Sequence, residues 1–296
     1  MHARYCLLFL IHSLFCCNTF NSRQEETFIA KDFTEEGLFS NNIEGPAFDR
    51  HGNLYVVNFH TDGTIGRVSA DGRAELYLTL PEGSTANSIQ FDSRGTMFLA
   101  DFTGHNVLAV TPVTKAVNVF VHDDTFHQPN DLCINRRDQL FVSDPDWKNE
   151  TGQIWRVDPD GTIVLLKDSM GTTNGIELSP DDRILYVNES VQRKIWAFDV
   201  DTTGNISNQR LFLEFPDYGF DGMKCDREGN LYVTRYGKGT IAILTPDGTL
   251  FREVFLKGKN CSNLVFGGAD GRTVFITLQD RGGMEVFRSD IAGKWY

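Results

Sequence analysis

A pattern of short apolar runs separated by tight turns recurs six times along the chain, and few stretches show helical periodicity. In the first copy we expect residues 45–48 to begin an inner strand, residues 51–53 to form a Gly-containing hairpin turn and residues 54–57 to return as a second strand. Residues 64–68 and 74–78 would then form a third and an outer strand. The pattern predicts four short antiparallel strands per repeat.

One polar residue stands a few places ahead of each apolar phrase. The six are Glu44, Asn87, Asn130, Asn174, Asp221 and Asn263, at intervals of 43, 43, 44, 47 and 42 residues. A period in the forties made of short strands is typical of a β-propeller with about four strands per blade. The sequence therefore predicts an all-β fold, a six-bladed β-propeller that forms a single domain over residues 23–296.

The sixth repeat ends soon after residues 284–288 and lacks an outer strand of its own. Residues 27–32 stand ahead of the first repeat, where the outer strand of a preceding blade would lie. We expect this N-terminal strand to complete the last blade, to bury Phe28 and Ile29, and to remove the open sheet edges.

Residues 1–22 differ in character from the repeats. His2 and Arg4 precede an apolar run over residues 6–17, which is too short to span a bilayer and is typical of a signal peptide. We therefore expect a signal peptide over residues 1–22 and a secreted, periplasmic or extracellular protein. A cytoplasmic protein is the alternative if this segment is not a signal.

The net charge of −12 and a pI near 5.0 argue against a nucleic-acid partner, which calls for a basic face. No later stretch is apolar and long enough for a membrane span. We expect a monomer that acts on a small molecule. Cys133, Cys225 and Cys261 show no metal-binding spacing and are expected to be buried free thiols.

Because every inner strand of a propeller starts at the same face, the six leading residues should share one end of the central channel. Glu44, Asn130, Asn174 and Asp221 offer carboxylate and carboxamide oxygens, which hard divalent cations prefer. The ring holds no histidine, which argues against zinc or iron. We predict one divalent cation. Ca²⁺ is the preferred candidate, and Zn²⁺, Mn²⁺ or Mg²⁺ are the alternatives.

The alternative interpretation is that Asn before a strand only satisfies a turn. Six polar residues in one register, with Glu and Asp among them, favour a site. The second strands end in a wider ring, expected at the same face: Asn58, Asp101, Asp144, Asn188, Arg235 and Thr277. Asp144 is the first reserve candidate for the acid/base and Asp101 is the second, although an Asp before Pro145 is also typical of a turn.

Four short motifs carry a resemblance to a known family. Glu44-Gly45-Pro46, Asn130-Asp131, Asn174-Gly175 and Asp221-Gly222-Met223 resemble motifs of the SMP-30/gluconolactonase/LRE family, and the similarity extends over almost the whole chain after residue 40. The resemblance implies a six-bladed propeller with one divalent cation in its channel and lactone hydrolysis, or organophosphate hydrolysis in one relative.

The resemblance also implies roles for single residues. Glu44, Asn174 and Asp221 match metal ligands, and Asn130 matches a residue that contacts substrate, metal or both. Asp221 also matches the proposed acid/base. Where the family has an Arg-x-Asn pattern that reads a sugar hydroxyl, this chain has Gln128-Pro129-Asn130, so a broader lactone substrate is expected.

Three functions follow as hypotheses. The first is a metal-dependent lactonase in which Asp221 is catalytic and the substrate contacts Asn130, Asn87, Asp144 and Asn263. The second is an organophosphate or aryl-ester hydrolase on the same site. The third is a non-catalytic binding propeller, which would not be expected to carry an acidic ring such as Glu44 and Asp221, and fold alone does not decide among them.

Overall fold

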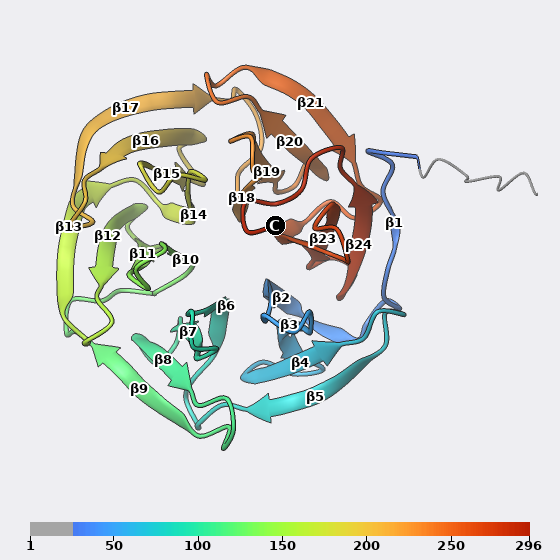
Figure 1. Cartoon of the computed structure of the whole chain (residues 1–296), viewed down its shortest axis with the longest axis horizontal. Coiled ribbons are helices and arrows are strands. Elements are labelled where there is room, and N and C mark those ends of the chain that lie inside the picture. Colours follow the sequence, from blue (N-terminus) through green and yellow to red (C-terminus); the bar gives the residue numbers. More distant parts are fainter. Residues whose placement is uncertain (1–25) are drawn as a thin grey trace, which may run out of the picture.

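The computed structural model describes residues 26–296, and within that range every regular element is a β-strand. Twenty-four strands form six four-stranded antiparallel sheets arranged around a central axis (Figure 1). The prediction of a six-bladed β-propeller is confirmed. Residues 1–22, the predicted signal peptide, lie outside the described residues. Over residues 26–296 there is no helix with the length and apolar character needed to cross a membrane.

Five blades are made of four consecutive strands, ordered from the axis outward. Blade 1 contains β2 (Phe39–Phe48), β3 (Leu54–Phe59), β4 (Thr64–Val68) and β5 (Ala74–Thr79). Blade 2 contains β6 (Ala86–Phe91), β7 (Met97–Asp101), β8 (Asn106–Val110) and β9 (Val117–His122). Blade 3 contains β10 (Leu132–Ile134), β11 (Leu140–Asp146), β12 (Thr151–Val157) and β13 (Ile163–Met170). Blade 4 contains β14 (Thr173–Leu178), β15 (Ile184–Glu189), β16 (Lys194–Val200) and β17 (Ile206–Glu214). Blade 5 contains β18 (Met223–Cys225), β19 (Leu231–Arg235), β20 (Thr240–Leu244) and β21 (Leu250–Phe255).

Blade 6 joins the two ends of the described chain, as the sequence predicted. Its strands are β22 (Cys261–Gly267), β23 (Thr273–Leu278), β24 (Gly283–Arg288) and, outermost, the N-terminal β1 (Lys31–Asp32). Lys31 pairs with Val286 and Asp32 with Glu285, in antiparallel register. Arg281 fixes the join by donating to Asp32 at 2.8 Å.

At this join the predicted burial is confirmed for Phe28 and wrong for Ile29. Phe28 packs on Phe287, with ring centroids 6.2 Å apart, but Ile29 is 56% exposed. Phe28 has a φ of +61° and the regular pairing starts only at Lys31, so Ile29 lies outside the paired strand that was predicted to bury it. Phe33, beyond β1, supplies the second apolar contact by packing edge-to-face on Phe275.

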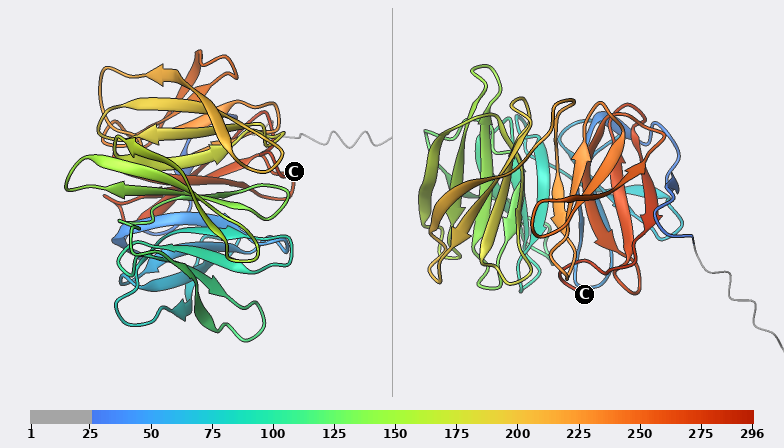
Figure 2. Two further views of the ribbon diagram at one scale, coloured as in Figure 1. Left: turned by 90° about the vertical axis from the view of Figure 1, so that its left-hand side faces the viewer. Right: turned by 90° about the horizontal axis from the view of Figure 1, so that it is seen from above.

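The hydrophobic core lies between neighbouring blades and not at the axis. Between blades 1 and 2, for example, Val57, Ile65, Leu99 and Leu108 form part of one fully buried cluster. Such clusters repeat around the ring, and the loops and turns lie at the two faces of the disc (Figure 2). The three cysteines of the repeats are buried and free, as expected: Cys133, Cys225 and Cys261. The axis is thereby left to polar side chains.

Candidate functional site

A cavity of about 370 Å³ lies at the end of the channel where the inner strands begin. Its lining includes five of the six residues of the predicted ring: Glu44, Asn87, Asn130, Asn174 and Asp221. The structure therefore brings together all four predicted metal ligands and Asn87. Asn263 does not line the cavity, although its side chain is close enough to lower the pKa of Glu44.

Breaks in strand register direct these side chains into the channel. The pairing of β2 with β3 shifts on both sides of Glu44, and that of β14 with β15 shifts between Thr173 and Ile176, around Asn174. Bulges of this kind bend a strand and redirect a side chain, and they are frequent beside active sites. The short strands β10 and β18 likewise begin only after Asn130 and Asp221.

Glycine follows several ring residues because the inner strands crowd together there. A Cβ on Gly45, whose φ is +48°, would lie 2.6 Å from the Cα of Ser88. A Cβ on Gly175 would lie 2.2 Å from the carbonyl oxygen of Asp221. No other residue fits such approaches, which explains why Gly recurs in the motifs at Glu44 and Asn174.

Several oxygens of the ring lack a hydrogen-bond partner within the described residues. The backbone N–H of Gly45 donates to Oε2 of Glu44 at 2.6 Å, but Oε1 has no partner. Oδ1 of Asn130 and Oδ1 of Asn174 are also buried without one. An unpaired buried oxygen costs about 1–3 kcal/mol, so native structures rarely keep several together. Carboxylate and amide oxygens left open around one cavity match the donors of a hard divalent cation.

Acidic side chains gather at this end of the channel. Burial raises the pKa of Glu44, and the nearby Asp131 raises it further. Burial also raises the pKa of Asp221, with Glu44 as the next cause. The Glu44 carboxylate therefore opposes the ionisation of Asp221. A bound cation would relieve that repulsion, which adds an electrostatic reason for the oxygen set to hold one.

Sequence reasoning missed the residues that form the wall above these oxygens. In five blades the first residue after the second strand lines the cavity: Phe102, Trp147, Ser190, Tyr236 and Gln279. Phe220, directly before Asp221, completes the wall. The signal was available in the repeat register, because these positions lie one to three residues beyond the aligned strand-end polar residues.

The wider ring does not reach the cavity, contrary to the expectation for Asp144. That carboxylate is fully buried and accepts hydrogen bonds from the backbone N–H groups of His127 and Gln128 and from Nε1 of Trp155. Asp101 is occupied similarly by Ser84 and by the Thr85 backbone. These strand-end side chains fix the loops that lead into the inner strands, so neither is placed to contact a substrate or move its proton.

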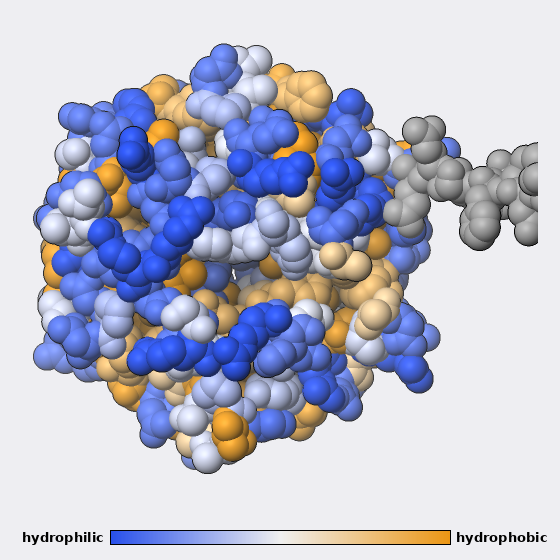
Figure 3. Space-filling view, in the orientation of Figure 1, coloured by the Kyte–Doolittle hydropathy of each residue, from blue (hydrophilic) through white to orange (hydrophobic). Residues whose placement is uncertain are grey.

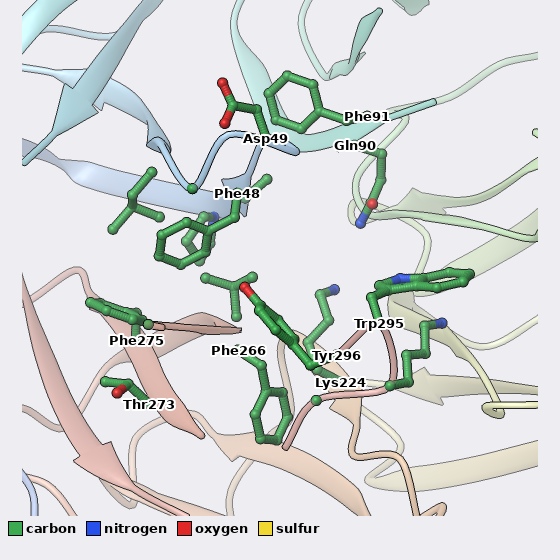
Figure 4. Close-up of a pocket in the computed structure, with 18 of the residues that line it drawn as sticks. Phe48, Asp49, Gln90, Phe91, Lys224, Phe266, Thr273, Phe275, Trp295 and Tyr296 are labelled. Atoms are coloured by element: carbon green, nitrogen blue, oxygen red, sulfur yellow. The ribbon is translucent and has the colours of Figure 1, made fainter. Parts of the chain in front are cut away.

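The opposite end of the channel holds a larger cavity, of about 1290 Å³. Figure 3 shows the face hollowed near its centre, and Figure 4 shows Trp295 and Tyr296 among the aromatic side chains around the hollow. Residues 289–296, here called the C-terminal strap, cross this face and bridge blades 5 and 6 through backbone hydrogen bonds. Lys294 of the strap is ion-paired with the buried Glu177, and Lys224 lies 3.7 Å from the same carboxylate.

Comparison with known proteins places the fold and these motifs in one family. Residues 31–280, which run from β1 through β23 and include every ring residue, match the SMP-30/gluconolactonase/LRE-like region. The chain belongs to the SMP-30/gluconolactonase/LRE-like family. A gluconolactonase of Zymomonas mobilis is 27% identical over 271 residues, covering 79% of this chain and 75% of the relative. A lactonase of Staphylococcus aureus is 24% identical over 249 residues, covering 79% of this chain and 76% of the relative.

The propeller of this family member also resembles solved structures. A calcium-binding protein from Agrobacterium tumefaciens, regucalcin, superposes with a TM-score of 0.76 at 20% identity, covering 88% of this chain and 95% of the other. At that identity the superposition supports the fold alone. The assignment of a reaction to this member of the family therefore depends on its own cavity.

Proposed function

We propose that this protein is a lactonase that opens a small cyclic ester in the 370 Å³ cavity and depends on a divalent cation, Ca²⁺ first, held there. The observation that carries the proposal is the set of buried oxygens on Glu44, Asn130 and Asn174 that have no partner among residues 26–296, with Asp221 beside them. The names of the relatives, a gluconolactonase and a lactonase, support the reaction class.

The floor of the cavity, formed by Glu44, Asn130, Asn174 and Asp221, supplies a role for each of these four residues. Glu44, Asn174 and Asp221 would hold the cation, with Asn130 shared between cation and substrate. A bound divalent cation would supply positive charge to polarise the ester carbonyl and favour the oxyanion of the transition state. Asp221, half-buried on the cavity floor, would take a proton from the attacking water or deliver one to the leaving alkoxide. The amide of Asn130 would orient the ester group.

The test is an assay of the hydrolysis of γ- and δ-lactones. The acid that hydrolysis releases is measured in weakly buffered solution. Protein stripped with chelator should be inactive, and adding back Ca²⁺, Mn²⁺, Mg²⁺ or Zn²⁺ singly should restore activity for at least one ion. Hydrolysis that continues unchanged without metal would contradict the metal dependence. Binding of lactones without turnover would instead favour a non-catalytic binding propeller.

A further inference from the structure

The wall of the 370 Å³ cavity differs chemically from its floor. Four aromatic residues line it, Phe102, Trp147, Phe220 and Tyr236, and none of the lining residues in the described part of the chain is Lys, Arg or His. Trp147 is 36% exposed at the rim, whereas Phe220 is fully buried. A ligand that reaches the oxygen-rich floor must therefore pass along the aromatic side chains. Once it is bound, its outer part lies against them.

The polar groups of the wall largely hydrogen-bond to one another. The hydroxyl of Ser190 donates to the carbonyl oxygen of Phe220 at 2.5 Å, and the hydroxyl of Tyr236 donates to Oε1 of Gln279 at 2.9 Å. A ligand with many hydroxyl groups would lose water on entering and would find few free partners above the floor. Such unpaired polar groups reduce binding, whereas apolar groups on aromatic surface increase it.

We propose that the cavity selects lactones that carry an apolar alkyl or aryl substituent over polyhydroxylated sugar lactones. This inference rests on the proposed lactonase function and specifies its substrate class. The ester group would lie on the floor at Asn130 and Asp221, and the substituent would lie against Phe102 and Trp147, with Tyr236 across from them. The cavity volume falls within the range of small-molecule sites, which leaves room for a ring with a short chain.

The experiment compares kcat/KM for γ-butyrolactone, γ-valerolactone, γ-heptalactone and glucono-δ-lactone in the metal-loaded protein. Each added methylene that is buried on aromatic surface should raise kcat/KM by about two- to fourfold, until the chain passes the rim. γ-Heptalactone should exceed glucono-δ-lactone by roughly tenfold or more. Because the wild-type series contains the comparison, the proposal can fail without any variant being made.

Two variants then locate the preference. Trp147→Ala and Phe102→Ala should reduce the gain in kcat/KM per methylene to less than about twofold. Phe255→Ala is the matched control, since Phe255 is an exposed aromatic residue (72%) on the outer strand β21, and it should leave the gain unchanged.

Faster turnover of glucono-δ-lactone than of γ-heptalactone by the wild type would overturn the inference. An unchanged gain per methylene in both wall variants would overturn it as well. Failure of the lactonase proposal looks different, because then no lactone in the series would be hydrolysed. In that event calorimetric binding of γ-heptalactone to wild type and Trp147→Ala still tests the wall: equal affinities would overturn the apolar preference, and weaker binding to the variant would support it.

Discussion

The two ends of the channel satisfy their buried charges in opposite ways. At one end Oε1 of Glu44 and Oδ1 of Asn174 are buried without a partner in the described chain. At the other end Glu177 is just as buried but is paired with Lys294 and lies 3.7 Å from Lys224. The paired end has the larger cavity, about 1290 Å³ against about 370 Å³.

We therefore base the proposed site on the state of the polar groups and not on the size of the cavity. A buried charge with an internal partner stabilises one arrangement of the chain, whereas a buried oxygen without one is kept at a cost and is suited to an external ligand. Lys224 lines the larger cavity. Burial lowers its pKa, but the charges of Asp131 and Glu177 outweigh that effect and raise it overall, so Lys224 itself remains cationic.

The largest effect on stability is expected from Lys294→Met at the far end. The change leaves the Glu177 carboxylate with the backbone N–H of Leu178 and the more distant Lys224, and breaking a buried ion pair costs about 3–5 kcal/mol. Chemical denaturation should show this loss, while lactone hydrolysis at temperatures where the protein is folded stays near the wild-type rate.

Lys257→Met is the matched control for that variant. The Lys257–Asp32 pair is about half exposed on both sides, and such a surface pair contributes only about 0–1 kcal/mol. If Lys294→Met left stability unchanged but abolished hydrolysis, the far end would belong to the active machinery and the comparison would fail.

At the opposite end Asp221→Asn should remove activity and leave the fold intact. The substitution keeps the side-chain volume but removes a charge and a proton acceptor, so we expect kcat to fall about 10²-fold or more. Steady-state kinetics together with a melting curve give both quantities. Asp124→Asn, at a fully exposed carboxylate, should be silent in both. Wild-type turnover by a metal-loaded Asp221→Asn protein would show that the acid/base lies elsewhere.

A smaller effect should appear in the pH dependence of the metal-free protein. Burial, with Asp131 nearby, raises the pKa of Glu44 to about 8, from an ordinary value of about 4.3. A carboxyl with a raised pKa contributes stability that is complete below its unfolded pKa and is lost as the pH rises through its folded pKa. The melting temperature of stripped wild-type protein should therefore fall between pH 5 and pH 8.5.

Glu44→Gln should reduce that slope, because the amide does not titrate. Melting curves of the two stripped proteins at matched ionic strength measure the difference. Parallel curves for the two proteins across this pH range would contradict the assignment of the charge strain to Glu44. Saturating Ca²⁺ should flatten the wild-type slope if the ion binds at these carboxylates.

Much of the fold could be predicted from sequence because a propeller repeats one unit. The register that aligns Glu44 with Asn130, Asn174 and Asp221 is enough to place them at one end of a channel. The role of Asp144 could not be read from that register. Whether a strand-end Asp faces the channel or accepts backbone hydrogen bonds from the loop before it, as Asp144 does from His127, depends on loop geometry.

Features built from non-repeating segments were also beyond the sequence pattern. The C-terminal strap follows the last repeat and has no counterpart in the others, so nothing in the period predicts the pairing of Lys294 with Glu177. The repeat register marks the positions of the wall but not its aromatic character, because the strand ends that carry Phe102 and Trp147 carry Ser190 and Gln279 in other blades.

The most direct test of the account is calorimetric titration of Ca²⁺ into chelator-stripped protein. We expect one site in the wild type. The isosteric Glu44→Gln variant should lose that site or bind at least about tenfold more weakly, since it removes one of the two carboxylate ligands. Glu177→Gln, at the paired end, should retain the site. Absence of binding for Ca²⁺, Mn²⁺, Mg²⁺ and Zn²⁺ alike, or equal Ca²⁺ affinity in Glu44→Gln, would contradict the assignment of the unpartnered oxygens to a cation.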